Sequence, residues 1–403
     1  MDNLPLHGIR ILALTTGAAG PTVANYLGQF GAEVINIESR VHPDTHRGGR
    51  NQERWNKSPT YIKLHRNKKS VTINMVNSRG LELANDLIRI SDVVVENFTL
   101  GVLERWGLGY PNVRKIKADI VMLSLRGLGS TGPRAADTTW GPNLTALFGL
   151  THLWNYPEAQ FPSSEARAQH PDFISGTCGA FAVMAALLHK ARTGKGQYID
   201  GAQVEAGAAL FGPMYLDYLV NKRVQKPQGN LSFIASPHGA YRCNGEDRWC
   251  VISVTTDAEW KAFCRAIGRP DWTQDPRFAT LTERLVHQKE IDGYIEKWTV
   301  KYAPHEVMEF LQSYGVPAGP VQDVEDLFTR DKQLLEEGFL VELVEPEMGP
   351  LVTEGLPLKL SDTPGSIREH APLMGEHTWQ VCRELLGLSA EEIRELEEQE
   401  VLY

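Results

Sequence analysis

The stretch that decides the fold is residues 9–38, IRILALTTGAAGPTVANYLGQFGAEVINIE. Ile9–Leu14 is an apolar run with the length of a buried strand, and Glu33–Glu38 reads as a second strand. Between them, Pro21 suits the first turn of a helix, since proline lacks the N–H that has no partner there, and Gly31 ends that helix. A strand, a helix and a strand in this order predict a β-α-β unit and therefore a parallel sheet.

The same alternation continues toward the C-terminus. Further strands are expected at 70–75, 92–96, 119–125 and 197–200, and helices at 80–90, 141–149, 176–192 and 203–219. This pattern predicts a doubly wound α/β domain with a Rossmann-like parallel sheet.

The amino-acid composition changes after Asn221, where a polar stretch with Pro and Gly indicates a linker or a mobile loop near Gly229. The segment beyond it predicts a smaller α/β domain, with a strand at 249–254 and helices at 258–267 and 289–298. A helical segment at 323–338, a strand near Leu358 and a helix at 390–398 are expected in the remainder.

Composition narrows the class of protein. The chain has 403 residues, a net charge of -9 and 42% hydrophobic residues, which is typical of a soluble protein with two domains. Its acidic balance speaks against nucleic-acid binding, which needs concentrated Lys and Arg. We expect no membrane span, because no apolar run approaches roughly 20 residues. The five cysteines form no CxxC pair, so we expect no metal site and a reducing cytoplasmic location.

Two segments have the chemistry of a site. Asp172 follows Pro171 where a helix is expected to begin, and a helix N-terminus stabilises a negative charge. Its carboxylate therefore fits an acyl nucleophile, although the local sequence alone favours a simple helix N-cap. The loop 15–21, TTGAAGP, lies between a strand and a helix, which suits either a bound phosphate or a simple tight turn.

Short motifs in a fixed order run through nearly the whole chain. Together they resemble the family III CoA-transferases, the group that contains formyl-CoA transferase and carnitine CoA-transferase. The motifs that carry the resemblance are Pro5–Arg10, Ala19–Pro21, Gly31–Ile35, Asn67–Ser70, Val95–Phe98, Leu108–Tyr110, Gly127–Gly129, Thr131–Pro133, Arg192–Gln197, Gly315–Pro320 and Gly375–Thr378.

The resemblance implies an interlocked-ring dimer whose large domain is built from both termini. Its four parts are the N-terminal part of a CoA-binding domain at 1–200, a linker helix and loop at 201–237, a small α/β domain at 238–322, and a return linker with the C-terminal part of the large domain at 323–403. Coenzyme A is then a substrate, with no tightly bound cofactor. The partner chain is either a second copy or a related subunit.

The resemblance also implies site residues. It places the catalytic aspartate at Asp172 and the CoA contacts at Thr16, Ala19, Arg40, Ile73, Asn97, Phe98 and Arg105. The chain departs from formyl-CoA transferase at Ala18, where that enzyme has a glutamine, and at Ser39 and Thr139, where it has basic CoA contacts.

The implied reaction moves CoA from an acyl-CoA to a carboxylic acid through an aspartyl anhydride and an aspartyl-CoA thioester. Residues 140–143 and 151–154 resemble the branch that takes larger or aromatic acids such as benzylsuccinate, with succinyl-CoA as donor. One alternative is an α-methylacyl-CoA racemase of the same fold, but its two bases would fall at Trp140 and Gly141. Another is a non-catalytic subunit of a heteromeric transferase.

Overall fold

The computed structural model describes residues 4–49, 51–161 and 170–403. The chain forms two compact units. We call the first the large unit, made of Met1–Thr151, Ser164–Val224 and Glu336–Tyr403, and the second the small unit, made of His152–Ser163 and Gln225–Leu335.

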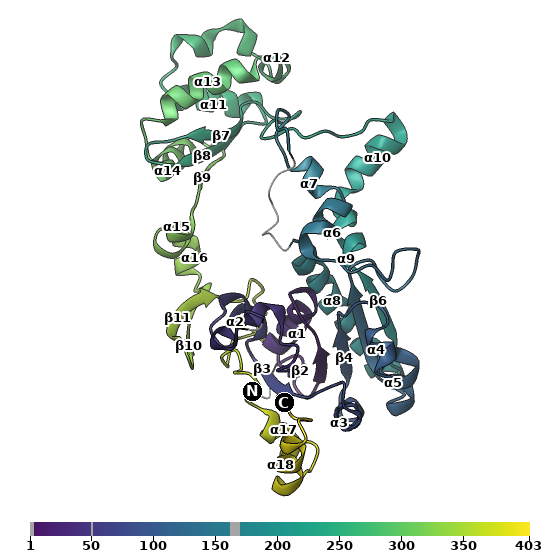
Figure 1. The fold of residues 1–403 in the computed structure, drawn as a ribbon. Coiled ribbons are helices and arrows are strands. Elements are labelled where there is room, and N and C mark those ends of the chain that lie inside the picture. The colour runs from purple at the N-terminus through teal and green to yellow at the C-terminus, as the bar shows by residue number, and fades with distance from the viewer. Residues whose placement is uncertain (1–3, 50, 162–169) are drawn as a thin grey trace. The chain divides into compact units, whose positions relative to one another are not determined.

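A six-stranded parallel sheet with the order β3-β2-β1-β4-β5-β6 runs through the large unit (Figure 1). This confirms the predicted doubly wound fold, whose strand order reverses between β1 and β4. The strands are β1 (Arg10–Leu14), β2 (Glu33–Glu38), β3 (Lys68–Thr72), β4 (Val93–Glu96), β5 (Val121–Arg126) and β6 (Tyr198–Ala202). β3 begins two residues before the expected strand, because Lys68 pairs with Val34 of β2.

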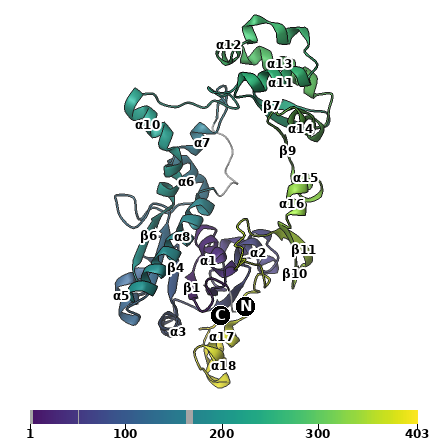
Figure 2. The ribbon, with the colours of Figure 1, turned by 180° about the vertical axis from the view of Figure 1, so that it is seen from behind.

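Helices cover both faces of this sheet (Figure 2). Successive side chains of a strand point to opposite faces, so Leu12 and Leu14 join one core cluster while Ile11 and Ala13 join the other. The first cluster packs against α3 (Ser78–Arg89), α5 (Tyr110–Ile116), α17 (Thr378–Glu384) and α18 (Ala390–Glu398). The second packs against α1 (Ala19–Gln29) and α8 (His170–Thr193).

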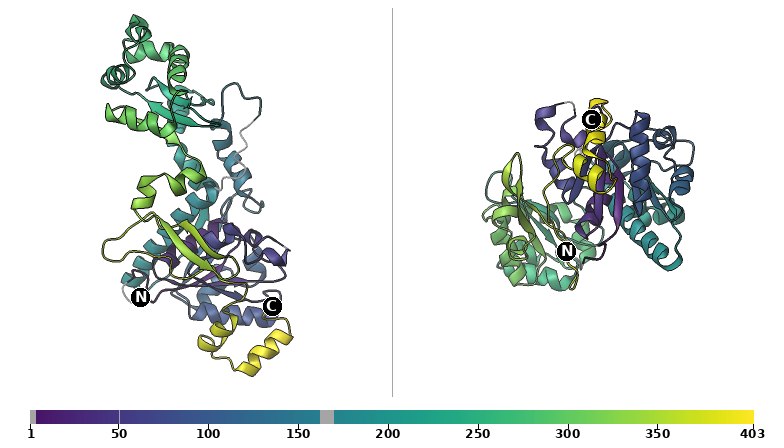
Figure 3. Two further views of the ribbon diagram at one scale, coloured as in Figure 1. Left: turned by 90° about the vertical axis from the view of Figure 1, so that its left-hand side faces the viewer. Right: turned by 90° about the horizontal axis from the view of Figure 1, so that it is seen from below.

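The two ends of the chain therefore build one core. Val381 and Ile393 of the C-terminal helices are buried with Val71 and Leu83 from the first hundred residues. Figure 3 shows the C-terminal helices, in yellow, beside the part of the large unit that holds the N-terminal strands. The backbone N–H of Asn74 also donates to the carbonyl of Val401, at 2.8 Å.

The described part of the large unit has further α-helices and strands outside the sheet and its covering helices. They are α2 (Pro59–His65), α4 (Val102–Arg105), α6 (Gly141–Leu147), α9 (Gln203–Ala208), α10 (Gly212–Asn221), β10 (Leu340–Glu345) and β11 (Gly349–Glu354), while α7 (Leu150–Leu153) ends at the boundary of the units. The helix expected at 203–219 is interrupted by a 3₁₀ turn, Ala209–Phe211, before Pro213. The strand expected near Leu358 is wrong: β10 and β11 form an antiparallel hairpin, and Leu358 lies exposed in the loop after it.

α8 is longer than expected, because it begins at His170 rather than at Gly176. It is the one helix of the described ranges long and apolar enough to cross a bilayer, by length and composition. Gly176, Ala180 and Val183 are nevertheless buried, and α8 packs on α1 and β5. One face of α8 therefore belongs to the core of the large unit, while Phe181 and Leu188 on it are exposed.

The small unit has its own antiparallel sheet and aromatic core around Trp260, Phe263 and Phe278. The strand and the two helices expected at 249–254, 258–267 and 289–298 are confirmed. The elements are β7 (His238–Arg242), β8 (Trp249–Ser253), β9 (Ala318–Val321), α11 (Asp257–Ala266), α12 (Leu281–Val286), α13 (Gln288–Thr299), α14 (Pro304–Ser313), α15 (Val324–Thr329) and α16 (Lys332–Glu336).

Candidate active site

The site lies where the strand order of the large unit reverses, at the carboxyl ends of β1 and β4. The backbone N–H of Thr16 donates to Oδ1 of Asn97 at 3.0 Å, and Nδ2 of Asn97 donates to the carbonyl of Thr16 at 2.8 Å. Gly20 allows this contact, because a Cβ there would lie 2.7 Å from Asn97 Oδ1. The loop after β1 is therefore held against the end of β4, at the edge where doubly wound folds bind ligands.

Close packing of α1 on α8 brings Asp172 to this loop. A Cβ at Gly176 would lie 2.7 Å from Thr22 Cβ, and a Cβ at Gly179 would lie 2.9 Å from Val23 Cγ2. Only glycine leaves room for the two helices at this separation. Asp172, in the first turn of α8, then lies near the start of α1, where the backbone N–H of Ala19 acts to lower the pKa of its carboxyl.

The environment of Asp172 shifts its acidity. Burial raises the pKa of its carboxyl to about 6, while its own backbone N–H and that of Ala19 act to lower it. The sequence led us to expect that the helix terminus would favour the ionised form, but desolvation outweighs that field. At pH 7 most Asp172 side chains are still ionised, and the raised pKa makes the carboxylate a better base and nucleophile.

A cavity of about 420 Å³ opens beside Asp172. Of the predicted CoA contacts, Thr16, Asn97 and Phe98 line it together with Asp172. Its walls also include Ala18, Thr45, His46, Arg126, Thr139, Trp140, Leu144 and Gln203.

A second cavity of about 240 Å³ shares Thr16 and Phe98 with the first. Ile73, another predicted contact, and Ser39 line it. The two cavities therefore adjoin across Thr16 and Phe98, at the carboxyl edge of the sheet. Arg40 and Arg105 are exposed and line neither cavity.

Comparison with known proteins now identifies the family. The family model described as CoA-transferase family III matches residues 6–378.

The chain belongs to CoA-transferase family III.

Two curated relatives resemble this CoA-transferase over almost its whole length. The beta subunit of succinyl-CoA–L-malate CoA-transferase from Chloroflexus aurantiacus is 32% identical, over 99% of this chain and 98% of its own. Formyl-CoA:oxalate CoA-transferase from Afipia carboxidovorans is 31% identical, over 97% and 96%. A solved CAIB/BAIF family protein from Brucella suis has a TM-score of 0.85 at 27% identity, over 95% of this chain and all of that one. The protein is thus an enzyme that transfers CoA between carboxylic acids.

The racemase alternative lacks its bases. Trp140 and Gly141, which stand at the positions of the two proton-transfer residues, line the cavity beside Asp172. The indole of Trp140 does not exchange protons near neutral pH, and Gly141 has no side chain. A two-base reaction therefore has no support at these positions.

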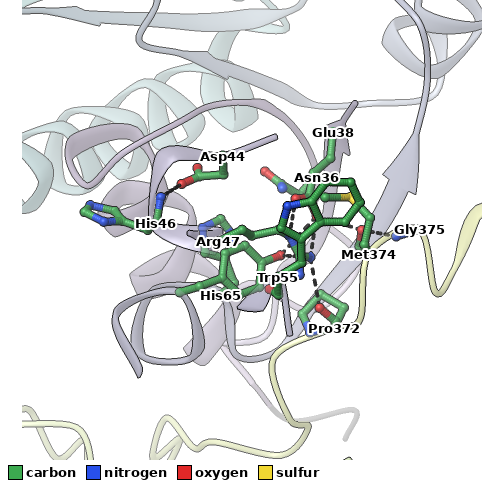
Figure 4. A network of polar contacts seen from close by, with 12 residues as sticks. Asn36, Glu38, Asp44, His46, Arg47, Trp55, His65, Pro372, Met374 and Gly375 are labelled. Atoms are coloured by element: carbon green, nitrogen blue, oxygen red, sulfur yellow. Dashed lines mark hydrogen bonds and ion pairs between the residues drawn. The ribbon is translucent and has the colours of Figure 1, made fainter. Parts of the chain in front are cut away.

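Sequence reasoning missed a charged network in this CoA-transferase (Figure 4). Nε and Nη2 of Arg47 donate to the two oxygens of Glu38 at 2.6 and 2.8 Å, and Nη2 also donates to the carbonyl of Pro372 at 3.0 Å. Ser70 and Tyr61 donate their hydroxyls to Glu38. Burial acts to raise the pKa of Glu38, but Arg47 and the hydroxyls outweigh it and hold that pKa below its usual value.

This network gives Glu38 a structural role. An acidic residue at the end of the second strand commonly binds a ribose in dinucleotide-binding folds. Here both oxygens of Glu38 are taken by Arg47 and its neighbours, so Glu38 is structural. A spacing of nine residues between Glu38 and Arg47, through a loop, has no helical or strand period that would have revealed the pair.

Asp44 and His46 are two further residues that the sequence did not reveal. Asp44 accepts the N–H groups of Gly17 and His46, at 3.1 and 2.7 Å, and burial raises its pKa to about 7. His46 lines the cavity beside Asp172, and burial lowers its pKa. Within 4–49, 51–161 and 170–403, no group of three His, Cys, Asp or Glu side chains is arranged to hold a metal.

The loop near Gly229 packs within the small unit. Its N–H donates to the carbonyl of Asn155 at 2.9 Å, and a Cβ at Gly229 would lie 2.7 Å from the Tyr156 ring. Gly229 also has a φ of +57°, so its backbone conformation and the lack of room for a Cβ both require glycine there. A lid role for this loop stays a prediction.

Proposed function

We propose that this CoA-transferase works through a covalent intermediate on Asp172, with succinyl-CoA as donor. The observation that carries the proposal is a carboxyl at the start of two helices, facing a cavity of about 420 Å³, with a pKa raised to about 6. Burial of a carboxylate against backbone N–H groups, without ion pairing, is how a fold makes such a group reactive.

The reaction begins when an Asp172 oxygen attacks the thioester carbonyl of the donor. The C–S bond breaks, CoA leaves as thiolate and a mixed anhydride remains. The thiolate attacks the aspartyl carbonyl, the anhydride C–O bond breaks, and the donor acid leaves an aspartyl-CoA thioester.

The acceptor carboxylate then attacks that thioester and expels the thiolate, which forms a second mixed anhydride on Asp172. Attack of the thiolate on the acceptor's carbonyl gives the new acyl-CoA and restores the Asp172 carboxylate. No net proton transfer is required, and each step is a displacement at a carbonyl. Water must be kept out, because an anhydride hydrolyses readily, and the buried Ala135 and Leu144 give the cavity apolar walls.

We assign CoA to the two adjoining cavities. Thr16 and Phe98 line both, Asn97 lines the first and Ile73 the second, so an extended pantetheine arm along them would reach Asp172. Ala19 acts through its N–H on Asp172. Arg40 and Arg105, both exposed, are the proposed partners of the CoA phosphates.

The walls of the Asp172 cavity and the similar proteins both bear on the acceptor acid. Trp140 and Leu144 give the Asp172 cavity an apolar side, which supports a larger or aromatic acid such as benzylsuccinate. The similar Chloroflexus aurantiacus protein is named for succinyl-CoA and L-malate, which supports a dicarboxylic acid. A matrix of acyl-CoA donors against malate, oxalate and benzylsuccinate, read by chromatography, separates these acceptors.

We also propose that a second chain covers the large unit. α10 has no buried residue, and its apolar side chains are 37–76% exposed at Met214, Tyr215, Leu216, Tyr218, Leu219 and Val220. α8 likewise exposes Phe181 and Leu188. Apolar patches of this kind mark protein interfaces. The partner is a second copy, as in an interlocked dimer, or a related subunit, since the Chloroflexus aurantiacus relative is named a beta subunit.

Trapping tests the covalent step. The protein is incubated with succinyl-CoA and hydroxylamine and then digested, and peptides are read by mass spectrometry for a hydroxamate at Asp172. Asp137 is the internal control, because it lines the same cavity but is exposed and paired with Arg134. An unmodified Asp172 during turnover, or modification of Asp137 instead, would contradict the proposal. Mass photometry of the purified chain distinguishes a homodimer from a heteromer.

A further inference from the structure

The loop Thr15–Ala18 connects the chemistry of the site to the sheet. It runs from the end of β1 to Ala19, and Thr16, Gly17 and Ala18 line the same cavity as Asp172. The N–H of Ala19 acts to lower the pKa of the Asp172 carboxyl. Gly17 has a φ of +69°, so the loop bends through a conformation that needs support from its neighbours. Asn97 holds one side of it through Thr16.

Asp44 holds the other side. One of its oxygens accepts the Gly17 N–H at 3.1 Å, and the other accepts the His46 N–H at 2.7 Å. The second bond caps the 3₁₀ turn η1 (Thr45–Arg47). Asp44 is only 5% exposed, so its two bonds are made away from competing water.

The turn that carries Asp44 is itself anchored. Arg47 is fully buried and bonded to Glu38, Tyr61 and Pro372, beside Asp44 and His46 (Figure 4). Thr45 and His46 of the same turn line the cavity of Asp172. A turn anchored by these bonds thus forms one wall of the cavity and also supports the loop beside Asp172.

We infer that Asp44 is a positioning residue for the transfer reaction, which holds the Thr15–Ala18 loop so that the Ala19 N–H meets the Asp172 carboxylate. This inference rests on the proposed function of Asp172. It requires both Asp44 oxygens, because one serves the turn and the other serves the loop.

Several charged groups lie near these two carboxyls. Asp137, Arg126 and His46 line the cavity of Asp172. Lys63 lies over the ring of Phe173, the residue that follows Asp172. Glu38, Arg47 and Lys68 face Asp44. Arg126 is itself paired with Glu96 and Glu104, at 3.0 and 3.3 Å.

Variants with one acceptor oxygen test the inference. Asp44→Asn and Asp44→Ser can each cap the turn but cannot serve both N–H groups. Acylation of Asp172 by succinyl-CoA is followed in a single turnover from pH 5 to pH 8. Asp292→Asn is the matched control, because Asp292 is a carboxyl of raised pKa in the small unit that accepts the Tyr241 hydroxyl.

We expect both Asp44 variants to acylate at least about tenfold more slowly at pH 7, since a small misplacement of reacting groups has effects of this size. Loss of the Ala19 N–H should also raise the pKa of Asp172 and move the acid limb of the rate profile to higher pH. Removing the Asp44 charge would shift that limb only slightly, and to lower pH, because a pKa of about 7 leaves Asp44 mostly protonated near pH 6. The Asp292→Asn control should match the wild-type profile.

Two results would overturn the inference: wild-type rates and profile in either folded Asp44 variant, or a limb that moves to lower pH. Circular dichroism identifies the folded variant, and Asp44→Ser serves if Asp44→Asn does not fold. If the wild-type protein is not acylated at Asp172 at all, the proposed function fails instead, and the two failures are distinct.

Discussion

Two buried carboxyls of the large unit behave in opposite ways. Glu38 ends β2 and has Arg47, Ser70 and Tyr61 as partners, so its pKa stays below the usual value despite full burial. Asp172 lies in the first turn of α8 and has backbone N–H groups as its partners, and burial raises its pKa to about 6.

Both carboxyls are buried, so the partners of Glu38, rather than burial, account for the opposite directions of the two pKa shifts. A buried carboxylate whose two oxygens are both hydrogen-bonded to a guanidinium or to hydroxyls is stabilised in its charged form and is a weaker nucleophile. A carboxylate stabilised only by N–H groups, beside a cavity, can attack an acyl group.

Removing the reactive carboxyl should have the largest effect. We expect Asp172→Ala to lower kcat by about 10⁴-fold or more, which is typical of the loss of a covalent nucleophile. The measurement is CoA exchange between succinyl-CoA and labelled succinate, with circular dichroism to show that the variant folds. Retention of exchange in the folded variant would assign the nucleophile elsewhere.

Removing Arg47, the charged partner of Glu38, should lower the free energy of unfolding. Arg47→Met leaves Glu38 buried and uncompensated, and we expect the free energy of unfolding to fall by about 3–5 kcal/mol in urea. The double variant Arg47→Met/Glu38→Gln should recover part of that loss, because it removes the unpaired charge. Equal losses in the single and double variants would show that Glu38 and Arg47 do not act as a pair.

Separating α1 from α8 should have an intermediate effect. A methyl group at Gly176 meets Thr22 at 2.7 Å, so we expect Gly176→Ala to destabilise the fold by about 1–3 kcal/mol and to slow exchange. Gly293→Ala is the control in helix α13, where a Cβ has nothing within 4 Å. It should stabilise by up to about 1 kcal/mol. Equal thermal shifts in the two variants would contradict close packing at Gly176.

The smallest effect concerns the cost of keeping Asp172 charged. Its pKa is raised from 3.8 in the unfolded chain to about 6 in the fold, so the folded state binds the proton more tightly. Ionisation therefore destabilises the fold above pH 6, and this cost is relieved as the pH falls toward 4. We expect Asp172→Asn to raise the free energy of unfolding by about 1 kcal/mol at pH 7.

Denaturation in urea at pH 7 and at pH 4.5 checks this sign. The gain from Asp172→Asn should shrink at the lower pH, and wild-type exchange should decline as the pH drops below 6. A gain that grows on acidification would mean that the pKa of Asp172 is lowered in the fold rather than raised.

The sequence by itself determined the local pattern. Apolar runs at Ile9–Leu14 and Glu33–Glu38, with Pro21 and Gly31 between them, predicted the β-α-β unit, because strand length and helix ends are set by neighbouring residues. Asp172 was placed at a helix start for the same reason, although α8 begins at His170. The pattern did not reveal the hairpin at 340–354, whose strands are too exposed for a buried-strand signal.

Which residues come into contact, and how their side chains ionise, depends on the tertiary structure. Asn97 reaches Thr16 across 81 positions, and Arg47 reaches Pro372 across 325. Partners this far apart leave no period in the sequence, since they are brought together by the sheet order and by helix packing. The same packing sets the desolvation that gives Asp172 its raised pKa, and desolvation depends on the whole surrounding fold rather than on any stretch of chain.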